Sequence, residues 1–538
     1  MTLPASVYAA FAATAAHYPD HGFLCVPSRP GRDYDPDGLE LTYREAAAQI
    51  EALQAAYAAA GYGPGHRVAL LLKMRPAHFL HFLALNALGC GIVPVNPDYR
   101  HDEMLYLLEH SEADLVVSVP HRVADLKKVA ADCRDKPLPV LDVTAMPAEI
   151  PPPQSAARAV AIGHETEASL LYTSGTTGRP KGCILSNFYF LTAGAWYRDL
   201  GGVVAIREGQ DRFYNPLPVF HMNHFAVTGT CAILTGNCLI LTERFSPNRW
   251  WQEIVETRAT IIHYLGVVPP LLLNQPETTV EKQHRVRFGL GAGVEPELHG
   301  VFEQRFGFPL AEVWGMTETG RIYCDCIEPR QIDTRAFGRP LPGLEAMVAD
   351  EQGRELPRGQ EGELLVRHSA GDPRRGFFSG YLKNAAATEE AWAGGWFHTG
   401  DVVRMAEDGM IYFVDRRKNI IRRSGENIAA AEIEACLQAH DAVAQVAVLA
   451  APDEIREQEV MACILPMPGV APSPELAAAL FDWCHARLAY FKAPGWLLFV
   501  DSLPTTGTQK VQKTQIFAPG EDPRARPGIH DFRARKKR

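Results

Sequence analysis

Stretches with helical periodicity alternate with short apolar runs along this chain, and this alternation most constrains its fold. A helical pattern from Tyr43 to Ala60 is followed by a glycine-rich turn and the apolar run Val68 to Leu72. A second helical pattern then leads to the apolar run Ile92 to Val95. Strands that alternate with helices form a mostly parallel sheet with helices on both faces. The sequence therefore predicts an α/β fold with doubly wound layers.

The pattern changes near Asp415, and this change predicts a second domain. A strand hairpin there ends in the charged run Asp415-Arg416-Arg417-Lys418. The remaining residues, about 120, alternate between helical and strand patterns and are enough to fold alone. We expect a large N-terminal domain of packed, mostly parallel β-sheets with helices over residues 1–415, and a small mobile C-terminal α/β domain over residues 416–538.

Composition and charge exclude several classes of function. The formal net charge of -10 gives no basic surface for DNA or RNA, whose phosphates proteins neutralise with Lys and Arg. The one basic run, residues 533–538, is typical of a solvated, frayed tail. The longest apolar stretch, residues 82–95, is shorter than the roughly 20 residues of a membrane helix. We therefore expect neither a nucleic-acid partner nor a membrane span.

The cysteines and the N-terminus favour a cytoplasmic location. Eleven cysteines are scattered along the chain without a Cys-x-x-Cys pair, so neither a zinc ribbon nor a redox dithiol is indicated. The alanine-rich N-terminus lacks the basic segment and the continuous apolar core of a signal peptide. A reducing compartment is the expected one.

A glycine- and hydroxyl-rich segment follows the apolar strand at residues 169–172. It consists of Thr173, Ser174, Gly175, Thr176, Thr177, Gly178, Arg179, Pro180, Lys181 and Gly182. Glycines let backbone N–H groups approach an anion, hydroxyls add donors, and Lys181 supplies a positive charge. A hairpin loop is the alternative, but this composition favours polyphosphate binding. The P-loop pattern is absent, because Pro180 and Cys183 stand where it requires its second glycine.

These residues resemble the acyl-adenylate-forming superfamily, which includes acyl-CoA synthetases, firefly luciferase and the adenylation domains of peptide synthetases. The segment YTSGTTGRPKG is close to the superfamily signature, and the chain is most like a bacterial-type acyl-CoA ligase. Other matching blocks recur in order over nearly the whole chain: Pro216 to His221, Trp314 to Glu318, His398 to Asp401, Asp415 to Lys418, Ser424 to Ile428, and Leu503 to Thr506 before Lys510.

The resemblance implies an AMP-forming carboxylic acid–CoA ligase with ATP, Mg2+ and coenzyme A as cofactors. A carboxylate is a poor electrophile, so it is first condensed with the α-phosphate of ATP to a mixed anhydride whose leaving group is AMP. The enzyme must bring two anions together and stabilise their charge. The expected partners are therefore small molecules, namely a carboxylic acid, ATP and coenzyme A. Related enzymes are monomers or homodimers.

The resemblance also assigns the nucleotide site. The segment from Thr173 to Gly178, with Lys181, contacts phosphate. The aromatic Trp314 and the adjoining Gly315 flank adenine. The turn residue Asp401 is suited to accept hydrogen bonds from two ribose hydroxyls.

Three further residues complete this assignment. Arg416 can donate hydrogen bonds to the same ribose. Thr317 contacts phosphate, and Glu318 helps to hold Mg2+, which prefers carboxylate and phosphate oxygens.

The acyl pocket is expected in segments that are mostly apolar or rich in glycine. His221 lies where the family places a residue that contacts the reacting carboxylate, although a lone histidine beside apolar residues is often a core group. The implied lining is His221, Met222, Gly291, Gly293 and Met316. This lining predicts an aromatic, alicyclic or medium-chain acid, and no spare carboxylate is evident in these segments for a carnitine-like cation.

Lys510 is the residue to which the resemblance assigns the first step, in a catalytic set with Thr317, Glu318 and His221. Its ammonium can reach both the attacking carboxylate and the α-phosphate. The family has a glycine before this lysine, whereas this chain has Gln509, which leaves Lys513 as a weaker rival.

The second step is expected to use a rotated C-terminal domain. By resemblance the hinge is Lys418, two positions after Arg416. The segment Ser424, Gly425 and Glu426 would then line a tunnel for the pantetheine arm, where Gly425 leaves room for the thiol.

Two other functions stay open. The chain could load a carrier-protein thiol or release acyl-AMP. It could also be a non-catalytic nucleotide-binding protein, as Gln509 and Trp314 suggest.

Overall fold

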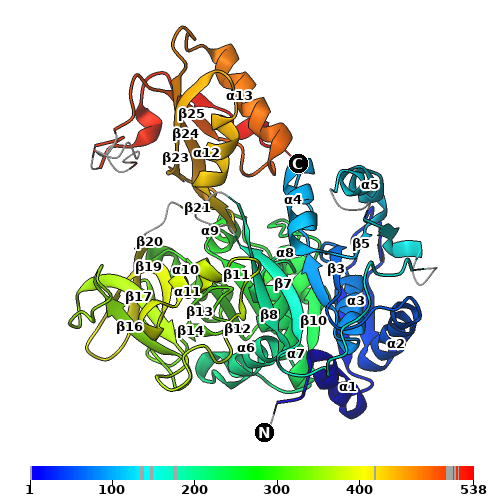
Figure 1. The fold of residues 1–538 in the computed structure, drawn as a ribbon. Helices are drawn as coiled ribbons and strands as arrows, with labels where there is room; N and C mark the ends of the chain where they lie inside the picture. The colour runs from blue at the N-terminus through cyan, green and yellow to red at the C-terminus, as the bar shows by residue number, and fades with distance from the viewer. Residues whose placement is uncertain are drawn as a thin grey trace. The chain divides into compact units, whose positions relative to one another are not determined.

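Contacts divide the chain into two compact units, which are described separately (Figure 1). Unit 1 comprises Met1–Pro97, Leu108–Leu171 and Gly182–Asp415, and unit 2 comprises Asp98–Leu107, Tyr172–Lys181 and Arg416–Arg538. The computed structural model describes residues 3–133, 138–145, 150–173, 179–416, 420–504, 513, 516–518 and 520–537. The domain limits expected from the sequence stay a prediction.

An eight-stranded sheet contains the candidate residues Gly291, Trp314 and Gly315. Its order is β14-β13-β12-β11-β9-β10-β1-β2, and the strands from β13 to β1 pair in parallel. The strands are β1 (Gly22–Val26), β2 (Leu39–Thr42), β9 (Arg212–Asn215), β10 (Cys238–Leu241), β11 (Ile261–Leu265), β12 (Phe288–Ala292), β13 (Leu310–Gly315) and β14 (Ile322–Cys324). Their nearly continuous burial is typical of parallel strands that are covered on both faces.

A seven-stranded sheet contains both strands that the sequence predicted most clearly. Its order is β18-β8-β7-β4-β3-β5-β6. Its strands are β3 (Arg67–Leu71), β4 (Gly91–Pro94), β5 (Leu115–Ser118), β6 (Val140–Asp142), β7 (Glu167–Thr173), β8 (Lys181–Ser186) and β18 (Gly380–Tyr381). Because β7, β4, β3, β5 and β6 pair in parallel, the predicted parallel α/β layer is confirmed.

A third, five-stranded sheet in the order β15-β20-β19-β17-β16 is built differently. Its strands are β15 (Ala336–Gly338), β16 (Glu345–Ala349), β17 (Glu361–Arg367), β19 (Phe397–Met405) and β20 (Ile411–Arg416). Strands β15 and β20, β16 and β17, and β17 and β19 pair antiparallel. The sequence analysis foresaw only the β19–β20 hairpin of this sheet.

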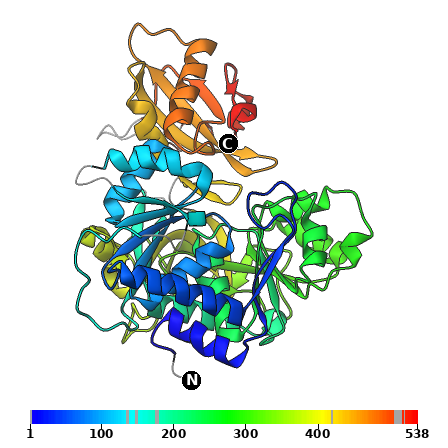
Figure 2. The same ribbon diagram turned by 90° about the vertical axis from the view of Figure 1, so that its right-hand side faces the viewer.

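The helices begin where the sequence supplies capping groups. Thr42 and Glu45 form a reciprocal capping box at the start of α2, and Ser186 accepts a hydrogen bond from the Tyr189 N–H at the start of α6. Figure 2 shows α1, α2 and α3 side by side. The helices outside residues 416–538 are α1 (Val7–His17), α2 (Tyr43–Ala59), α3 (Pro76–Ala87), α4 (His101–Ser111), α5 (Val123–Ala131), α6 (Asn187–Asp199), α7 (Thr230–Thr235), α8 (Trp250–Glu256), α9 (Val268–Leu273), α10 (Pro296–Phe306), α11 (Ala385–Ala391) and the π-helix η4 (Asn223–Gly229).

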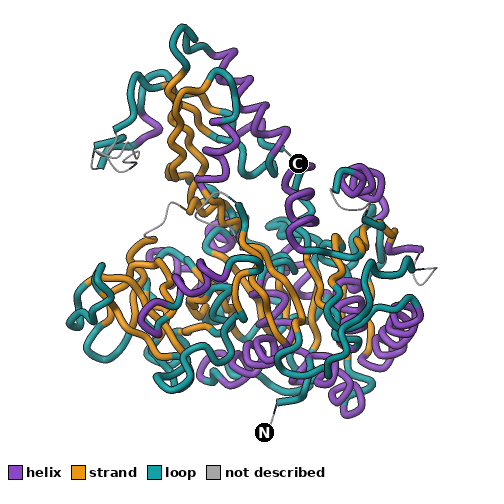
Figure 3. The backbone as a smooth tube through the Cα atoms, in the orientation of Figure 1, coloured by secondary structure: helices purple, strands orange, loops and turns teal. Residues whose placement is uncertain are grey.

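Within residues 416–538 of unit 2, the part of the chain that the structure describes forms a sheet with two α-helices. The sheet has the order β22-β21-β24-β25-β26, and β23 pairs with β24. Alternate residues of β24 face opposite sides: Val460 and Ile464 pack with the helices, whereas Met461 packs in a second cluster. The elements, coloured by type in Figure 3, are β21 (Ile420–Arg423), β22 (Glu426–Ala429), α12 (Ala430–Gln438), β23 (Val443–Asp453), β24 (Glu457–Pro466), α13 (Pro474–Arg487), β25 (Trp496–Phe499) and β26 (His530–Asp531).

The end of the chain is anchored in unit 2, so its interpretation as a solvated tail is wrong for Lys536. The Phe532 ring stacks on Phe481 at 5.1 Å between centroids. The Lys536 ammonium is completely buried and donates to Glu459 Oε1 and to the carbonyl oxygen of Phe491. Glu459 Oε2 accepts a hydrogen bond from Arg423 Nε at 2.7 Å. The tail therefore completes a buried ion cluster that the sequence pattern did not reveal.

Two further observations concern expectations made from composition. No helix within the described residues has the length and apolarity needed to cross a membrane. All eleven cysteines are free.

Replacing Lys536 with Met should destabilise the small sheet, because it removes one partner of a buried carboxylate. Breaking a buried ion pair on one side costs about 3 kcal/mol. Burial and the nearby Arg423 lower the pKa of Lys536 to about 7, so urea unfolding is best measured at pH 6, where the ammonium is charged. The exposed neighbour Lys537 provides the control. Lys537→Met should change the unfolding free energy by less than about 0.5 kcal/mol. Equal stability of the two variants would contradict the anchoring role.

Candidate functional site

The candidate residues of unit 1 gather at one edge of the eight-stranded sheet. Strands β9, β11, β12 and β13 are parallel neighbours and end at Asn215, Leu265, Ala292 and Gly315. Ligands of open parallel sheets bind beyond the carboxyl ends of the strands. Two predicted sets, the nucleotide residues at the end of β13 and the glycines at the end of β12, therefore lie along the same edge.

Trp314 and Asp401, which the sequence analysis assigned to adenine and ribose, are in direct contact. The Trp314 indole is stacked near Tyr323 and Phe337, with centroid distances of 5.6 and 6.0 Å. Its Nε1–H donates to Asp401 Oδ2 at 2.8 Å, and both side chains are buried. The bond fixes the carboxylate beside the ring, and this places the predicted adenine and ribose contacts next to each other.

A glycine and a second carboxylate shape the turn before Asp401. Gly400 has a φ of 71°, in the left-handed region that favours glycine. Its N–H donates to Glu363 Oε1 at 2.9 Å, and His398 Nδ1 lies 3.2 Å from Glu363 Oε2. The contact of His398 with Glu363 is consistent with a structural role for this histidine.

Glu318 is a buried carboxylate held by a tyrosine. Its Oε1 accepts a hydrogen bond from the Tyr381 hydroxyl at 2.8 Å, and its backbone oxygen accepts one from the Phe378 N–H at 2.9 Å. Burial and this carboxylate raise the pKa of Tyr381 well above its usual value, so the phenol stays a donor. The backbone oxygen of Thr317 accepts from the Tyr189 hydroxyl at 2.7 Å.

This environment fits the metal role predicted for Glu318. Mg2+ is commonly bound by one or two carboxylates together with substrate phosphates. The described residues contain no group of three or more metal-ligating side chains. An oriented single carboxylate is therefore the kind of ligand that such a phosphate-bound ion needs. Tyr381, which orients it, was missed, because a tyrosine 63 residues away gives no signal in the sequence.

Backbone geometry explains why the two predicted pocket positions, Gly291 and Gly293, are glycine. A Cβ on Gly291 would lie 2.3 Å from the Tyr264 carbonyl oxygen, so no larger residue fits. Gly293 has a φ of 87°, and its N–H donates to Glu312 Oε2 at 2.7 Å. Glu312 Oε1 accepts from the Tyr264 hydroxyl at 2.6 Å. Burial raises the pKa of Glu312 to about 7. Glu312 was not predicted from the sequence, where its one signal is a charged residue within an apolar strand.

His221 and Met222 precede the π-helix η4. The His221 carbonyl oxygen accepts from the Phe225 N–H at 3.2 Å, and Met222 is buried. His224 Nδ1 lies 2.6 Å from the carbonyl oxygen of Leu217, and burial lowers the pKa of this histidine to about 4. His224 is therefore a neutral core group. Met316, the last predicted pocket residue, is half-buried just beyond β13.

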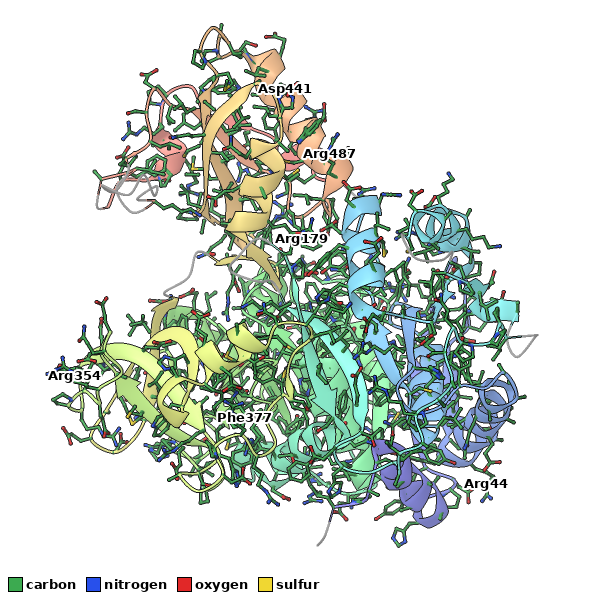
Figure 4. The ribbon with its side chains drawn as sticks, in the orientation of Figure 1. Arg44, Arg179, Arg354, Phe377, Asp441 and Arg487 are labelled. Carbon is green, nitrogen blue, oxygen red and sulfur yellow. The ribbon has the colours of Figure 1, made fainter. Side chains whose placement is uncertain are left out.

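Other predicted residues belong to unit 2 and are described there. Thr173 ends β7, and Lys181 begins the neighbouring strand β8. Arg179, which is labelled in Figure 4, lies over the ring of Tyr106 at 5.1 Å. The Tyr106 hydroxyl donates to the carbonyl oxygen of Pro180 at 2.9 Å. Arg416 ends β20. The predicted residues Ser174 to Gly178, Lys418 and Lys510 lie outside the described residues.

The predicted pantetheine segment is a tight turn between β21 and β22. Arg423 pairs with Glu426, and the two residues between them have positive φ angles, 49° at Ser424 and 87° at Gly425. Two such residues form the turn that suits a two-residue hairpin. Lys513, the rival of Lys510, makes an ion pair with Glu434 at 2.7 Å. The assignment of the first step to Lys510 stays a prediction.

Comparisons with known proteins agree with the motifs. The family model described as AMP-binding enzyme matches residues 11–382, and the model described as AMP-binding enzyme C-terminal domain matches residues 432–510. A crotonobetaine/carnitine–CoA ligase of Proteus mirabilis is 30% identical over 507 residues, covering 89% of this chain and 93% of that protein. A sulfoacetate–CoA ligase of Cupriavidus necator is 30% identical over 529 residues, covering 95% and 97%.

Solved structures show the same fold. The o-succinylbenzoate CoA synthetase of Bacillus subtilis, bound with a product analogue, has a TM-score of 0.80 at 25% identity and covers 96% of this chain and 98% of that one. An amide bond synthetase of Marinactinospora thermotolerans has a TM-score of 0.78 at 25% identity, covering 94% and 98%. The resemblance to adenylate-forming enzymes and the class of AMP-forming CoA ligase, which uses ATP, Mg2+ and coenzyme A, are confirmed.

Replacing Trp314 with Phe should weaken ATP binding, because the ring remains but the donor to Asp401 is lost. Loss of a hydrogen bond to a buried carboxylate costs about 1.5–3 kcal/mol, so the KM for ATP should rise roughly tenfold or more. Trp250→Phe is a matched control, since the Trp250 Nε1 atom is buried in unit 1 without a hydrogen-bond partner. An unchanged KM for ATP in Trp314→Phe would rule out the positioning of Asp401 by this bond.

Proposed function

Because this chain belongs to the AMP-binding enzyme family, we propose that it joins a carboxylic acid to coenzyme A at the expense of ATP. A carboxylate oxygen attacks the α-phosphorus of ATP, and pyrophosphate leaves. The sulfur of coenzyme A then attacks the acyl carbon of the resulting acyl-AMP. The bond to AMP breaks, and the thiol proton passes to solvent. The CoA ligases among the relatives support this assignment.

The observation that carries the proposal is the Trp314–Asp401 hydrogen bond at the carboxyl edge of the parallel strands. It joins an aromatic surface suited to a purine with a carboxylate suited to vicinal hydroxyls. The buried Glu318 lies two residues beyond Met316 in the same block. Mg2+ held by Glu318 would neutralise phosphate charge when the nucleotide is bound.

The remaining roles follow the family resemblance. The segment from Thr173 to Gly178 and Lys181 bind the phosphates, and Arg416 donates to the ribose. Lys510 offsets the charge that develops between the carboxylate and the α-phosphate. The small domain turns about Lys418 before the second step, in which Ser424, Gly425 and Glu426 line the pantetheine path.

The acid is proposed to lie beside His221, Met222, Gly291, Gly293 and Met316. The apolar side chains of Met222 and Met316 support an aromatic, alicyclic or medium-chain acyl group. The eleven free thiols support a reducing, cytoplasmic setting for the enzyme. A monomer or homodimer is the expected assembly.

Lys510→Ala should abolish adenylate formation and spare the thioester step when preformed acyl-AMP is supplied. Loss of a group that stabilises transition-state charge lowers the rate about 100-fold or more. Lys513→Ala is the matched control, because the Lys513 ammonium is paired with Glu434, and it should leave pyrophosphate exchange within about threefold of the native rate. Equal loss in both half-reactions of Lys510→Ala would refute the role of this lysine.

The function itself is tested by ATP–pyrophosphate exchange with a panel of aromatic and short- to medium-chain acids, followed by addition of coenzyme A. We expect acid-dependent exchange and then equal amounts of thioester and AMP. Exchange without thioester would instead identify an enzyme that loads a carrier protein or releases acyl-AMP. Binding of ATP without exchange for any acid would support a non-catalytic nucleotide-binding protein.

A further inference from the structure

A buried hydrogen-bond network adjoins the proposed acid site at the carboxyl end of β9. Asn215 ends this strand, His263 lies in the neighbouring strand β11, and Asn223 begins η4 two residues after His221. Asn215 and His263 are completely buried. The direction of each hydrogen bond in the network can be worked out from its neighbours.

The orientation of Asn215 is set by the backbone. The Leu217 N–H donates to Asn215 Oδ1 at 3.0 Å, so the amide nitrogen of Asn215 faces the other way. This Nδ2 lies 3.0 Å from Asn223 Oδ1 and 3.0 Å from Thr228 Oγ1. Because Nδ2 only donates, Asn223 must present its oxygen to Asn215.

The tautomer of His263 follows from this orientation. Its Nδ1 lies 3.1 Å from Asn223 Oδ1, which only accepts, so Nδ1 carries the proton. Its Nε2 accepts from the Tyr197 hydroxyl at 3.2 Å. The Thr228 hydroxyl also lies 3.4 Å from Nε2, but it donates to the nearer Asn223 carbonyl oxygen at 2.8 Å and leaves Nε2 to the tyrosine. Burial lowers the pKa of His263 to about 3, so the ring is neutral.

Asn223 Oδ1 therefore accepts two hydrogen bonds, from Asn215 and His263, and the amide nitrogen of Asn223 takes no part in the network. Among the described residues, none accepts a hydrogen bond from Asn223 Nδ2. Asn223 is also the one residue of η4 that is not buried. Its two N–H donors are consequently held by a rigid network and available to a ligand. π-Helical segments such as η4 are rare, and those that occur are often found at functional sites.

The position of Asn223 fits the acyl end of the substrate. Its partner Asn215 ends β9, three strands from β13, which carries Trp314. Adjacent strands are about 4.8 Å apart, so the two strand ends are separated by about 14 Å along the edge of the sheet. That span is comparable with the length of an AMP moiety. A nucleotide over β13 would thus direct the acyl group towards β9.

We propose that Asn223 selects carboxylic acids that carry an uncharged hydrogen-bond acceptor, a hydroxyl or carbonyl oxygen, on the acyl group. This inference rests on the proposed function, and it refines the substrate from an apolar acid to an oxygen-bearing one. An ammonium group would require an acceptor, whereas the Asn223 amide presents donors. A second anion would lose its hydration beside neutral groups, since His224 and His263 both stay uncharged.

The test compares kcat/KM for pyrophosphate exchange between acids that differ in one oxygen. The pairs are 3-hydroxybutanoate with butanoate, 4-oxopentanoate with pentanoate, and 4-hydroxybenzoate with benzoate. In at least one pair the native enzyme should prefer the oxygen-bearing acid tenfold or more. An acid without this oxygen leaves the N–H donors of Asn223 unpaired. Asn223→Leu, of similar volume, removes the amide donors and should reduce this ratio to about one.

Two further variants separate recognition from folding. Asn223→Asp keeps an oxygen for Asn215 and His263 but presents an acceptor instead of donors, so it should shift preference towards 4-aminobutanoate. Asn248→Leu alters an exposed asparagine and should change neither ratio.

Three results would overturn the inference. Selection by Asn223 would be refuted if the native enzyme preferred no oxygen-bearing acid, or if the ratio were unchanged in Asn223→Leu. In both cases acid-dependent exchange would still support the proposed function. Absence of exchange with every acid would refute the proposed function, and the inference with it.

Discussion

Parallel pairing of β9, β11, β12 and β13 is the constraint on which the site of unit 1 depends. Because parallel strands end at the same edge, residues far apart in the sequence meet there without any local signal. Asn215 and Trp314 are 99 positions apart in the numbering but lie at the ends of two strands of one sheet. The glycine at 291 is part of the same constraint, since the Tyr264 carbonyl oxygen leaves no space for a Cβ.

Directional hydrogen bonds then give this edge its chemistry. Neutral donors from other elements hold three carboxylates: Tyr381 holds Glu318, Trp314 holds Asp401, and Tyr264 holds Glu312. A neutral donor orients a carboxylate without cancelling its charge, as a metal-binding or ribose-binding group requires. The asparagines and His263 extend this principle to the acyl side, where the Leu217 N–H determines the direction of the whole network.

In unit 2, a buried ion cluster of Arg423, Glu459 and Lys536 holds distant parts of the chain together. Glu459 lies between Arg423 and Lys536, so the turn end of the β21–β22 hairpin and the end of the chain share one carboxylate. The family match to the C-terminal domain ends at residue 510, before this tail. The anchored tail is therefore a feature of this chain outside the matched region. It ties the hairpin that carries Ser424 and Gly425 to the core of the small sheet.

The sequence by itself determined the class of fold, the family and the order of its chemical blocks. Local periodicity predicted α2, β3 and β4 within a few residues, because this signal acts between neighbours. Motif order also identified Trp314, Glu318 and Asp401. Only the tertiary structure decided that Trp314 bonds to Asp401, that Tyr381 orients Glu318, and that Glu312, Asn223 and Lys536 have defined contacts. Such contacts join residues distant along the chain, and their geometry exists only once the sheets have formed and excluded water.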